Sequence, residues 1–124
     1  MNITITTELP AAPLSPNSRS HWRVKHAASK KLKGATAAAT ETALALDSNS
    51  SLQPPYHEVS LLATYYHTCR RRRDPDNHIA KLKYAIDGLV DGGLLIDDDK
   101  ITLKPVQFAI DKAHPRLELH ITLG

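Results

Sequence analysis

Hydrophobic and polar positions alternate along several segments of this chain, and alternation is the period of a strand with one buried face. β-Branched and polar residues alternate at residues 2–9, and strand-forming residues such as valine and tyrosine are dense at 56–68. Alternation returns at 101–111 and at 116–123, on the two sides of a turn. We therefore predict four strands, with the last two paired as a hairpin.

Two other segments have the composition or the period of helices. Alanine, lysine and leucine dominate residues 26–46, whereas 13–23 is rich in proline, serine and arginine and is expected to be irregular and exposed. A second helix should begin near Asp74 or Asp76, either of which can cap its first turn, and should end at Gly92. Apolar residues recur at helical spacing in it and would face the core: Ile79, Leu82, Ile86 and Leu89.

The order of these elements, β-α-β-α-β-β, predicts the fold class. A chain of 124 residues is long enough for one domain with a core of its own, so we expect residues 1–124 to form a single domain. Strands that alternate with helices and close in a hairpin favour an α+β fold. In that fold a mixed sheet would carry both helices on one face.

A polar stripe accompanies the apolar face of the second predicted helix. At about 100° per residue, Lys83 and Asp87 return to within about 20° of Asp76. The stripe would lie roughly 100° from the centre of the apolar face, where it borders the core and stays open to a substrate. An ordinary ion pair between Lys83 and Asp87 is the alternative explanation.

Charge and cysteine content narrow the class of protein. Lysine and arginine number 16 against 13 acidic residues, and the formal charge of +3 with a pI near 9.1 favours an acidic partner. Basic residues concentrate between Arg19 and Lys33 and again at 70–73. The single cysteine, Cys69, excludes an internal disulfide, and no apolar run reaches transmembrane length. We expect a soluble, intracellular protein.

The four arginines at 70–73 stand directly before two carboxylates, Asp74 and Asp76. Four adjacent guanidinium groups repel one another and cannot be buried, so a polyanion such as nucleic acid is their natural partner. The carboxylates would repel the same phosphates unless a divalent cation lies between them, and Mg²⁺ takes both carboxylate and phosphate oxygens. The stretch therefore predicts metal-assisted phosphodiester chemistry. Taken singly, each aspartate is also a normal helix cap.

Two other metal sites fit the pattern less well. A calcium-binding EF-hand loop starting at Asp74 would need glycine where Ile79 stands and glutamate where Ala85 stands. A zinc site built from His67, Cys69 and His78 would lack both a recognised spacing and a fourth ligand.

A second acidic group, Asp97 to Asp99, follows the second predicted helix. Alone it indicates a solvated turn, since three adjacent like charges need water or a cation around them. If the strand after it packs beside the strand that ends at Arg70, the loop could bring a third carboxylate to Asp74 and Asp76.

The ordered motifs of this chain resemble those of the RusA-type Holliday-junction resolvases, which are small dimeric endonucleases of bacteria and phages. The resemblance rests on an arginine-rich Asp-x-Asp-Asn at 71–77, a Lys-x-x-x-Asp-x-Leu at 83–89, and an Asp-Asp at 97–98. Segments 16–19 and 116–119 also resemble segments of that family. The three central motifs cover about a quarter of the chain and are fairly specific as an ordered set.

The resemblance implies that Asp74, Asp76 and Asp98 are catalytic carboxylates that hold Mg²⁺, with Mn²⁺ as a substitute. It implies Lys83 as the catalytic lysine, which would stabilise developing charge or the leaving oxygen. Some members of the family place the lysine closer to Asp-x-Asp-Asn, so Lys81 is the competing candidate.

The resemblance also implies supporting residues and partners. Asn77 would orient a carboxylate or the water shell of the metal, and Asp87 would support the alignment of the site. The expected DNA-binding residues are Arg70, Arg71, Arg72, Arg73, Asn17, Arg19, Lys30 and Lys31, with Trp22 as a further candidate. The implied substrate is a four-way junction or other branched DNA, cut by a homodimer in the cytoplasm of a bacterium or a phage host. A broader branched-DNA or flap nuclease and a non-catalytic DNA-binding accessory protein remain alternatives.

Overall fold

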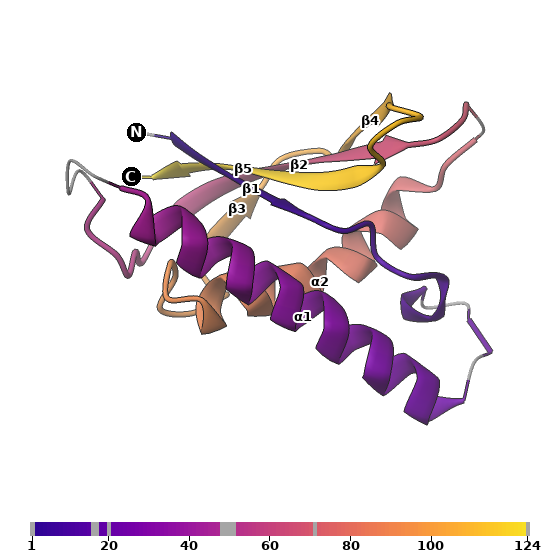
Figure 1. The fold of residues 1–124 in the computed structure, drawn as a ribbon, viewed down its shortest axis with the longest axis horizontal. Helices are drawn as coiled ribbons and strands as arrows, with labels where there is room; N and C mark the ends of the chain where they lie inside the picture. Colours follow the sequence, from indigo (N-terminus) through magenta and orange to yellow (C-terminus); the bar gives the residue numbers. More distant parts are fainter. Residues whose placement is uncertain (1, 16–17, 20, 48–51, 71, 124) are drawn as a thin grey trace.

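The computed structural model describes residues 2–15, 18–19, 21–47, 52–70 and 72–123, which form one sheet and two helices packed against it (Figure 1). In chain order the elements are β1 (Asn2–Thr7), the 3₁₀ turn η1 (Ala12–Leu14), α1 (Trp22–Ala45), β2 (Val59–His67), α2 (Pro75–Asp91), β3 (Ile101–Leu103), β4 (Gln107–Ile110) and β5 (Arg116–Leu123). The predicted α+β class and mixed sheet are confirmed. Neither of the two helices described is long and apolar enough to cross a membrane.

Strand β2 is at the centre of the sheet. β5 pairs with β2 in antiparallel fashion and with β1 on its other side, so it lies between the two. β3 and β4 both pair with β2 in parallel, β3 at the beginning of β2 and β4 near its end. The strand predicted at 101–111 is therefore two short strands. The break falls at 104–106, where Pro105 has no backbone N–H to donate to a ladder.

The predicted hairpin of the last two strands is wrong. β4 and β5 lie on opposite sides of β2, so the turn after β4 carries the chain across the end of β2 (Figure 1). Four side chains along one face of β5 are buried: Leu117, Leu119, Ile121 and Leu123. A strand that buries so much apolar surface is more stable inside the sheet than at its edge. Phe108 and Ile110 of β4 stay partly exposed, as expected for an edge strand.

Helix α1 begins earlier than the sequence predicts. Its N-cap is His21, whose Nδ1 accepts a hydrogen bond from the N–H of Arg23 over 3.1 Å. Trp22 is exposed as expected, but it is already helical, and η1 at residues 12–14 overlaps the start of the segment expected to be irregular. The N-cap bond explains this earlier start, because it gives a partner to a backbone N–H of the first turn that would otherwise have none within the helix.

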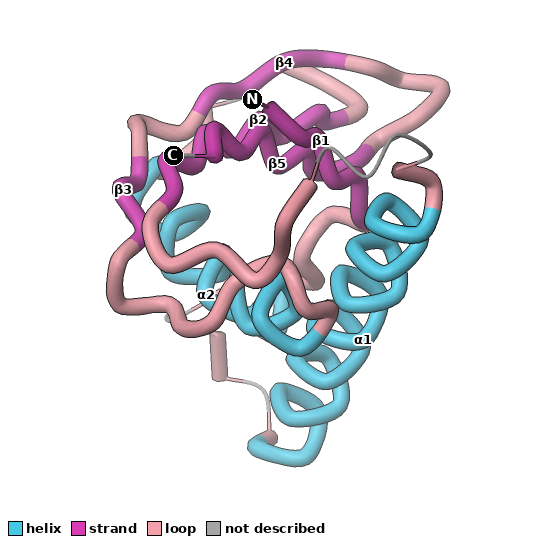
Figure 2. Tube along the Cα trace, turned by 90° about the vertical axis from the view of Figure 1, so that its left-hand side faces the viewer, coloured by secondary structure: helices cyan, strands magenta, loops and turns pink. Residues whose placement is uncertain are grey.

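Figure 2 shows α1 and α2 on the same side of the sheet. The helices approach closely where Gly88 of α2 and its C-cap residue Gly92 face Thr36 and Thr40 of α1, and both threonines are fully buried. A Cβ atom on Gly88 would lie 2.6 Å from the carbonyl oxygen of Lys33 and 2.6 Å from the Cβ of Thr36. The small size of these glycines therefore sets the distance between the two helices.

Replacing Gly88 with alanine should destabilise the protein by about 1–3 kcal/mol, because the new methyl group would overlap backbone that cannot move aside without separating the helices. Gly34, also within a helix, is the matched control. A Cβ there would meet no atom within 4 Å, so Gly34→Ala should stabilise the fold by about 0.5–1 kcal/mol. Thermal unfolding followed by circular dichroism measures both. Equal effects of the two substitutions would refute the close approach.

The buried face of α2 is rotated from the predicted one. Leu82, Ile86 and Leu89 are buried as predicted, but Ile79 is 39% exposed and His78 is buried in its place. The first turn of α2 therefore presents an imidazole, not an aliphatic side chain, to the end of β2. This rotation determines which groups surround the two aspartates.

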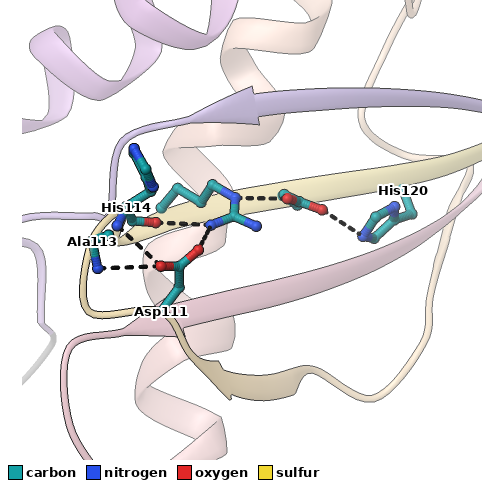
Figure 3. A network of polar contacts seen from close by, with 6 residues as sticks. Asp111, Ala113, His114 and His120 are labelled. Carbon is teal, nitrogen blue, oxygen red and sulfur yellow. Dashed lines mark hydrogen bonds and ion pairs between the residues drawn. The ribbon is translucent and has the colours of Figure 1, made fainter.

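The face of the sheet opposite the helices carries a charged network where β5 begins (Figure 3). The Arg116 guanidinium donates hydrogen bonds to Glu118 and Asp111, each over 2.7 Å, and it lies 3.8 Å from the centre of the Tyr66 ring. The hydrogen bond to Glu118 and, to a smaller extent, the one to Asp111 raise the pKa of Arg116. The hydrogen bond that Asp111 accepts from Arg116 lowers the pKa of Asp111. His120 lies 3.4 Å from Glu118 at the other end of the network. These contacts tie the turn after β4 to β5 and so fix the crossing over β2.

Candidate metal and DNA site at the start of α2

The first turn of α2 holds Asp74 and Asp76 in a fixed arrangement. Asp74 is the N-cap of the helix, and its Oδ1 accepts a hydrogen bond from the N–H of Asp76 over 3.0 Å. Pro75 occupies the first helical position, where its missing N–H costs nothing. Asp76 stands in the first turn, and both carboxylates are exposed. The capping role of Asp74 is therefore confirmed, and it leaves both carboxylates accessible to a ligand from solvent.

A cationic segment connects the end of β2 to these aspartates. Arg70 and Arg72 are exposed, whereas Arg73 is half-buried and donates a hydrogen bond from Nη2 to the carbonyl oxygen of Cys69 over 3.3 Å. Arg71 lies outside the described residues. The described arginines thus stand directly beside the first turn of α2, as the sequence predicts.

The two candidate lysines differ in their surroundings. Lys81 is half-buried, and burial followed by the charge of Arg73 lowers the pKa of its ammonium group. Lys81 also contributes to the electrostatic environment of His78 in the first turn. Lys83 is exposed, seven residues after Asp76, which is about 10 Å along the helix axis. Within one chain, Lys81 is the lysine that shares an environment with Arg73 and the start of α2.

A cluster of the Tyr65, His67 and His78 rings packs between β2 and the first turn of α2. The Tyr65 hydroxyl donates a hydrogen bond to the carbonyl oxygen of His78 over 2.7 Å, and burial raises the pKa of Tyr65. The Nδ1 of His78 lies 2.8 Å from the carbonyl oxygen of Asp74. A carbonyl can only accept, so this nitrogen carries the proton, and the Nε2 of His78 accepts from the Nε2 of His67 over 3.2 Å. Burial lowers the pKa of His78, which favours this neutral form.

This ring cluster is the part of the site that sequence reasoning missed. The sequence suggests His67 and His78 only as zinc ligands, but in the structure they hydrogen-bond to each other and join β2 to α2. The separate hydrogen bond from Nδ1 of His78 to the carbonyl oxygen of Asp74 holds the backbone of the cap residue and so positions its carboxylate. The only signal in the sequence was a histidine four residues before Leu82, the first buried leucine of the helical pattern, and the helical period alone assigned that place to Ile79.

Segments near the N-terminus contribute to the surroundings of α2. The Ser15 hydroxyl donates a hydrogen bond to Oδ1 of Asn77 over 2.9 Å, so the segment after η1 contacts the first turn of α2. Asn77 thus connects two segments through its carbonyl oxygen. Asn17, two residues after Ser15, lies outside the described residues.

The predicted basic residues before and within α1 are accessible. Arg19 and Lys30 are exposed. Lys31 is exposed as well, and it forms a long ion pair of 3.6 Å with Glu8. An exposed pair of this kind contributes little to stability, so Lys31 remains available to a stronger anionic partner.

The acidic loop lies at the opposite end of α2 (Figure 1). β3 does pack beside β2, but in parallel register with Val59, so the loop that precedes β3 lies at the beginning of β2 and not at its end. Asp98 lines an open depression of about 270 Å³ together with Asp87, Asp91 and Lys33. A hydrogen bond with Asp97, partial desolvation and the neighbouring carboxylates, Asp87 among them, raise the pKa of Asp98.

This placement corrects the expectation that the loop brings a third carboxylate to Asp74 and Asp76 within one chain. Asp76 and Asp87 are separated by eleven positions, or about 16 Å along α2. Asp87 accompanies Asp98, not Asp76. Among the residues that the structure describes, no three side chains of histidine, cysteine, aspartate or glutamate converge as a metal-binding group. Of the three predicted catalytic carboxylates, two therefore lie at the start of α2 and one lies near its end.

Comparison of the chain with models of known protein families and with curated proteins finds no match.

Proposed function

We propose that this protein is a Mg²⁺-dependent endonuclease that resolves Holliday junctions. One observation carries the proposal: two exposed carboxylates, Asp74 and Asp76, stand in a fixed turn beside a cationic segment. Cations attract the phosphates of DNA and carboxylates repel them, and a divalent cation removes that conflict. The resemblance of the surrounding motifs to the RusA-type resolvases supports the same activity.

The residues at the start of α2 fit a magnesium ion in part. Mg²⁺ commonly takes one or two carboxylates and completes its shell with water and substrate phosphate oxygens, and Asp74 and Asp76 can supply that pair. A magnesium ion held there would supply polarisation of a phosphate and activation of a water molecule. The exposed guanidinium groups of Arg70 and Arg72 would hold DNA phosphates in place. A lysine, Lys81 or Lys83, would stabilise negative charge on the leaving oxygen.

A homodimer would complete the site. Asp98, the third carboxylate that the resemblance implies, is at the far end of α2 in its own chain and would have to come from a partner chain. In a twofold dimer every contact occurs twice, and a partner whose acidic loop reaches the start of α2 would create two equivalent sites. Two sites suit a four-way junction, which must be cut in two symmetry-related strands to give intact duplexes.

The two alternative functions differ from this one in their requirements. A nuclease of broader specificity would use the same carboxylates and would cut flaps and forks as well. A non-catalytic DNA-binding protein needs no complete carboxylate site, and the separation of Asp98 from Asp76 within one chain is the observation that favours it. Under each of the three functions, the protein would act on DNA in the cytoplasm of a bacterium, or of the host of a phage.

A comparison of substrates tests the proposal. Four-way junction, flap and linear duplex of equal length are offered to the same preparation in Mg²⁺, and again with Mn²⁺. We expect cleavage of the junction, with little cleavage of the linear duplex. Equal cleavage of flap and junction would establish the broader nuclease. Binding of all three without cleavage by either ion would establish the accessory protein.

Neutralising Arg70 and Arg72 together should weaken DNA binding and reduce its dependence on salt. For every phosphate that no longer has an arginine partner, the slope of log affinity against log salt should flatten by about 0.9 on duplex DNA. Lys100→Gln with Lys104→Gln removes the same charge from exposed positions on either side of β3 and is the matched control. Fluorescence anisotropy at several salt concentrations measures the slope. Identical slopes for the two double variants would show that the arginines have no specific role.

A further inference from the structure

An open depression of about 670 Å³ lies beside the start of α2, between β4 and the segment that follows β2. Phe108 and Ile110 of β4 form its apolar part, and Arg70 and Arg73 line it on the other side. Cys69, which is exposed, also lines it. The depression is therefore apolar on one side and cationic on the other, and it adjoins Asp74 through Arg73.

The ring of Phe108 is held in place although it is not buried. Its centroid lies 4.8 Å from that of His78, with the two planes nearly perpendicular at 80°. It also lies 6.1 Å from the Tyr65 ring and 6.3 Å from the His67 ring. Yet Phe108 remains 38% exposed, because β4 is an edge strand, and Ile110 beside it is 43% exposed. A positioned aromatic ring with a solvent-facing surface is a platform on which a planar group can stack.

The charge of the depression indicates the kind of planar group. The described residues that line it include two guanidinium groups and no carboxylate. Arg73 uses Nη2 for the carbonyl oxygen of Cys69, but a guanidinium has five N–H donors and can serve an anion as well. An aromatic platform next to arginines is the combination that single-stranded nucleic acid uses, since a base stacks while its phosphates bind the cations.

We propose that this depression takes an unstacked nucleobase of the DNA, with its flanking phosphates on Arg70 and Arg73. The inference rests on the proposed action on DNA and names the form of DNA that this part of the site recognises. Arg73 directly precedes Asp74, so the unstacked base lies next to the backbone that reaches the carboxylates. A base at a branch point is already partly unstacked, so it enters at lower cost than a base within a continuous duplex. The depression thereby favours branched over linear DNA.

The test uses Cys69, the only cysteine of the chain, as a reporter within the depression. The rate of Cys69 alkylation by iodoacetamide is measured without divalent metal, so that no cleavage occurs. Three polyanions are compared: a single-stranded oligonucleotide, a fully paired duplex and an inorganic polyphosphate that has no bases. We expect the single strand to slow alkylation about tenfold at saturation and to protect Cys69 much more than the other two do.

Substitution of Phe108 supplies the second measurement. Phe108→Ala should weaken single-strand binding by about tenfold, within the range that loss of one stacked base gives. Phe108→Leu keeps apolar bulk but removes the aromatic ring, and it should weaken binding almost as much. Melting curves of both variants show whether either loss of binding comes from unfolding. Leu103→Ala, at a residue 45% exposed on the neighbouring edge strand, should leave binding unchanged.

The outcomes separate this inference from the proposed function. Equal protection by polyphosphate, with no effect of either Phe108 substitution, would overturn the inference and identify a simple anion site. If that result came with normal junction cleavage, the proposed function would stand without the base site. Protection by single strands that depends on Phe108 would support the inference even in a protein that cleaves no DNA.

Discussion

Asp76→Asn is expected to abolish junction cleavage in Mg²⁺ while leaving junction binding unchanged or slightly stronger. The carboxylate of Asp76 is exposed in the first turn of α2, and the amide is nearly the same size, so the fold should be retained. A metal-bound carboxylate supports several kcal/mol of transition-state stabilisation, which corresponds to a loss of at least about a hundredfold in rate. Loss of a negative charge beside DNA does not weaken binding. Cleavage rates and anisotropy titrations on the same junction measure the two effects.

Glu58→Gln is the control for this substitution. Glu58 is exposed just before β2 and lies outside the candidate site, so the variant makes the same change of charge without touching the first turn of α2. It should cleave at the normal rate. Normal cleavage by Asp76→Asn would rule out the proposed site, and equal loss of binding and cleavage would assign Asp76 to the fold instead of the chemistry.

Mixing two inactive variants should restore cleavage. Asp76→Asn and Asp98→Asn are each expected to be inactive, because each removes one half of every site in the proposed dimer. In a mixed dimer, one site carries both substitutions and the other carries neither. Random exchange of subunits would make half of the dimers mixed, so about a quarter of the sites should be intact. Co-refolded proteins in equal amounts, assayed for nicking of a junction, give the measurement.

The mixture distinguishes a shared site from a site within one chain. If Asp76 and Asp98 acted within the same chain, every site in a mixed dimer would contain one substitution, and the mixture would stay inactive. That result would contradict the shared site. Full activity of Asp98→Asn alone would remove Asp98 from the site. Sedimentation of the unmodified protein shows whether the required dimer forms.

The fold class could be predicted from the sequence because hydrophobic periods report on each element separately. α2 was predicted from its start signal to its terminal glycine, and β5 from four apolar residues at alternate positions. The pairing of strands could not be predicted in the same way. Alternation is compatible both with a hairpin of β4 and β5 and with two strands that do not pair with each other. In the structure β5 lies between β1 and β2, so β4 and β5 are on opposite sides of β2.

In the candidate site, too, the local sequence predicts some features, and others depend on how the chain folds. Arg70, Arg72 and the two aspartates are neighbours in sequence, so their proximity needed no knowledge of the fold. The position of Asp98 depends on the parallel register of β3 with the beginning of β2, and no local pattern reveals that register. The contacts of His78 with His67 and Phe108 likewise depend on how α2 is rotated about its axis. The helical period predicts Ile79 on the buried face of the first turn, one residue after the histidine that is buried there.

Cleavage of a four-way junction by the unmodified protein, followed at strand resolution with Mg²⁺ and with a chelator, decides whether the protein is the proposed nuclease. We predict two nicks at symmetry-related positions in opposite strands when Mg²⁺ is present, and none in the chelator. Equal cleavage under both conditions, or no cleavage by a protein that forms dimers and binds the junction, would contradict the proposal.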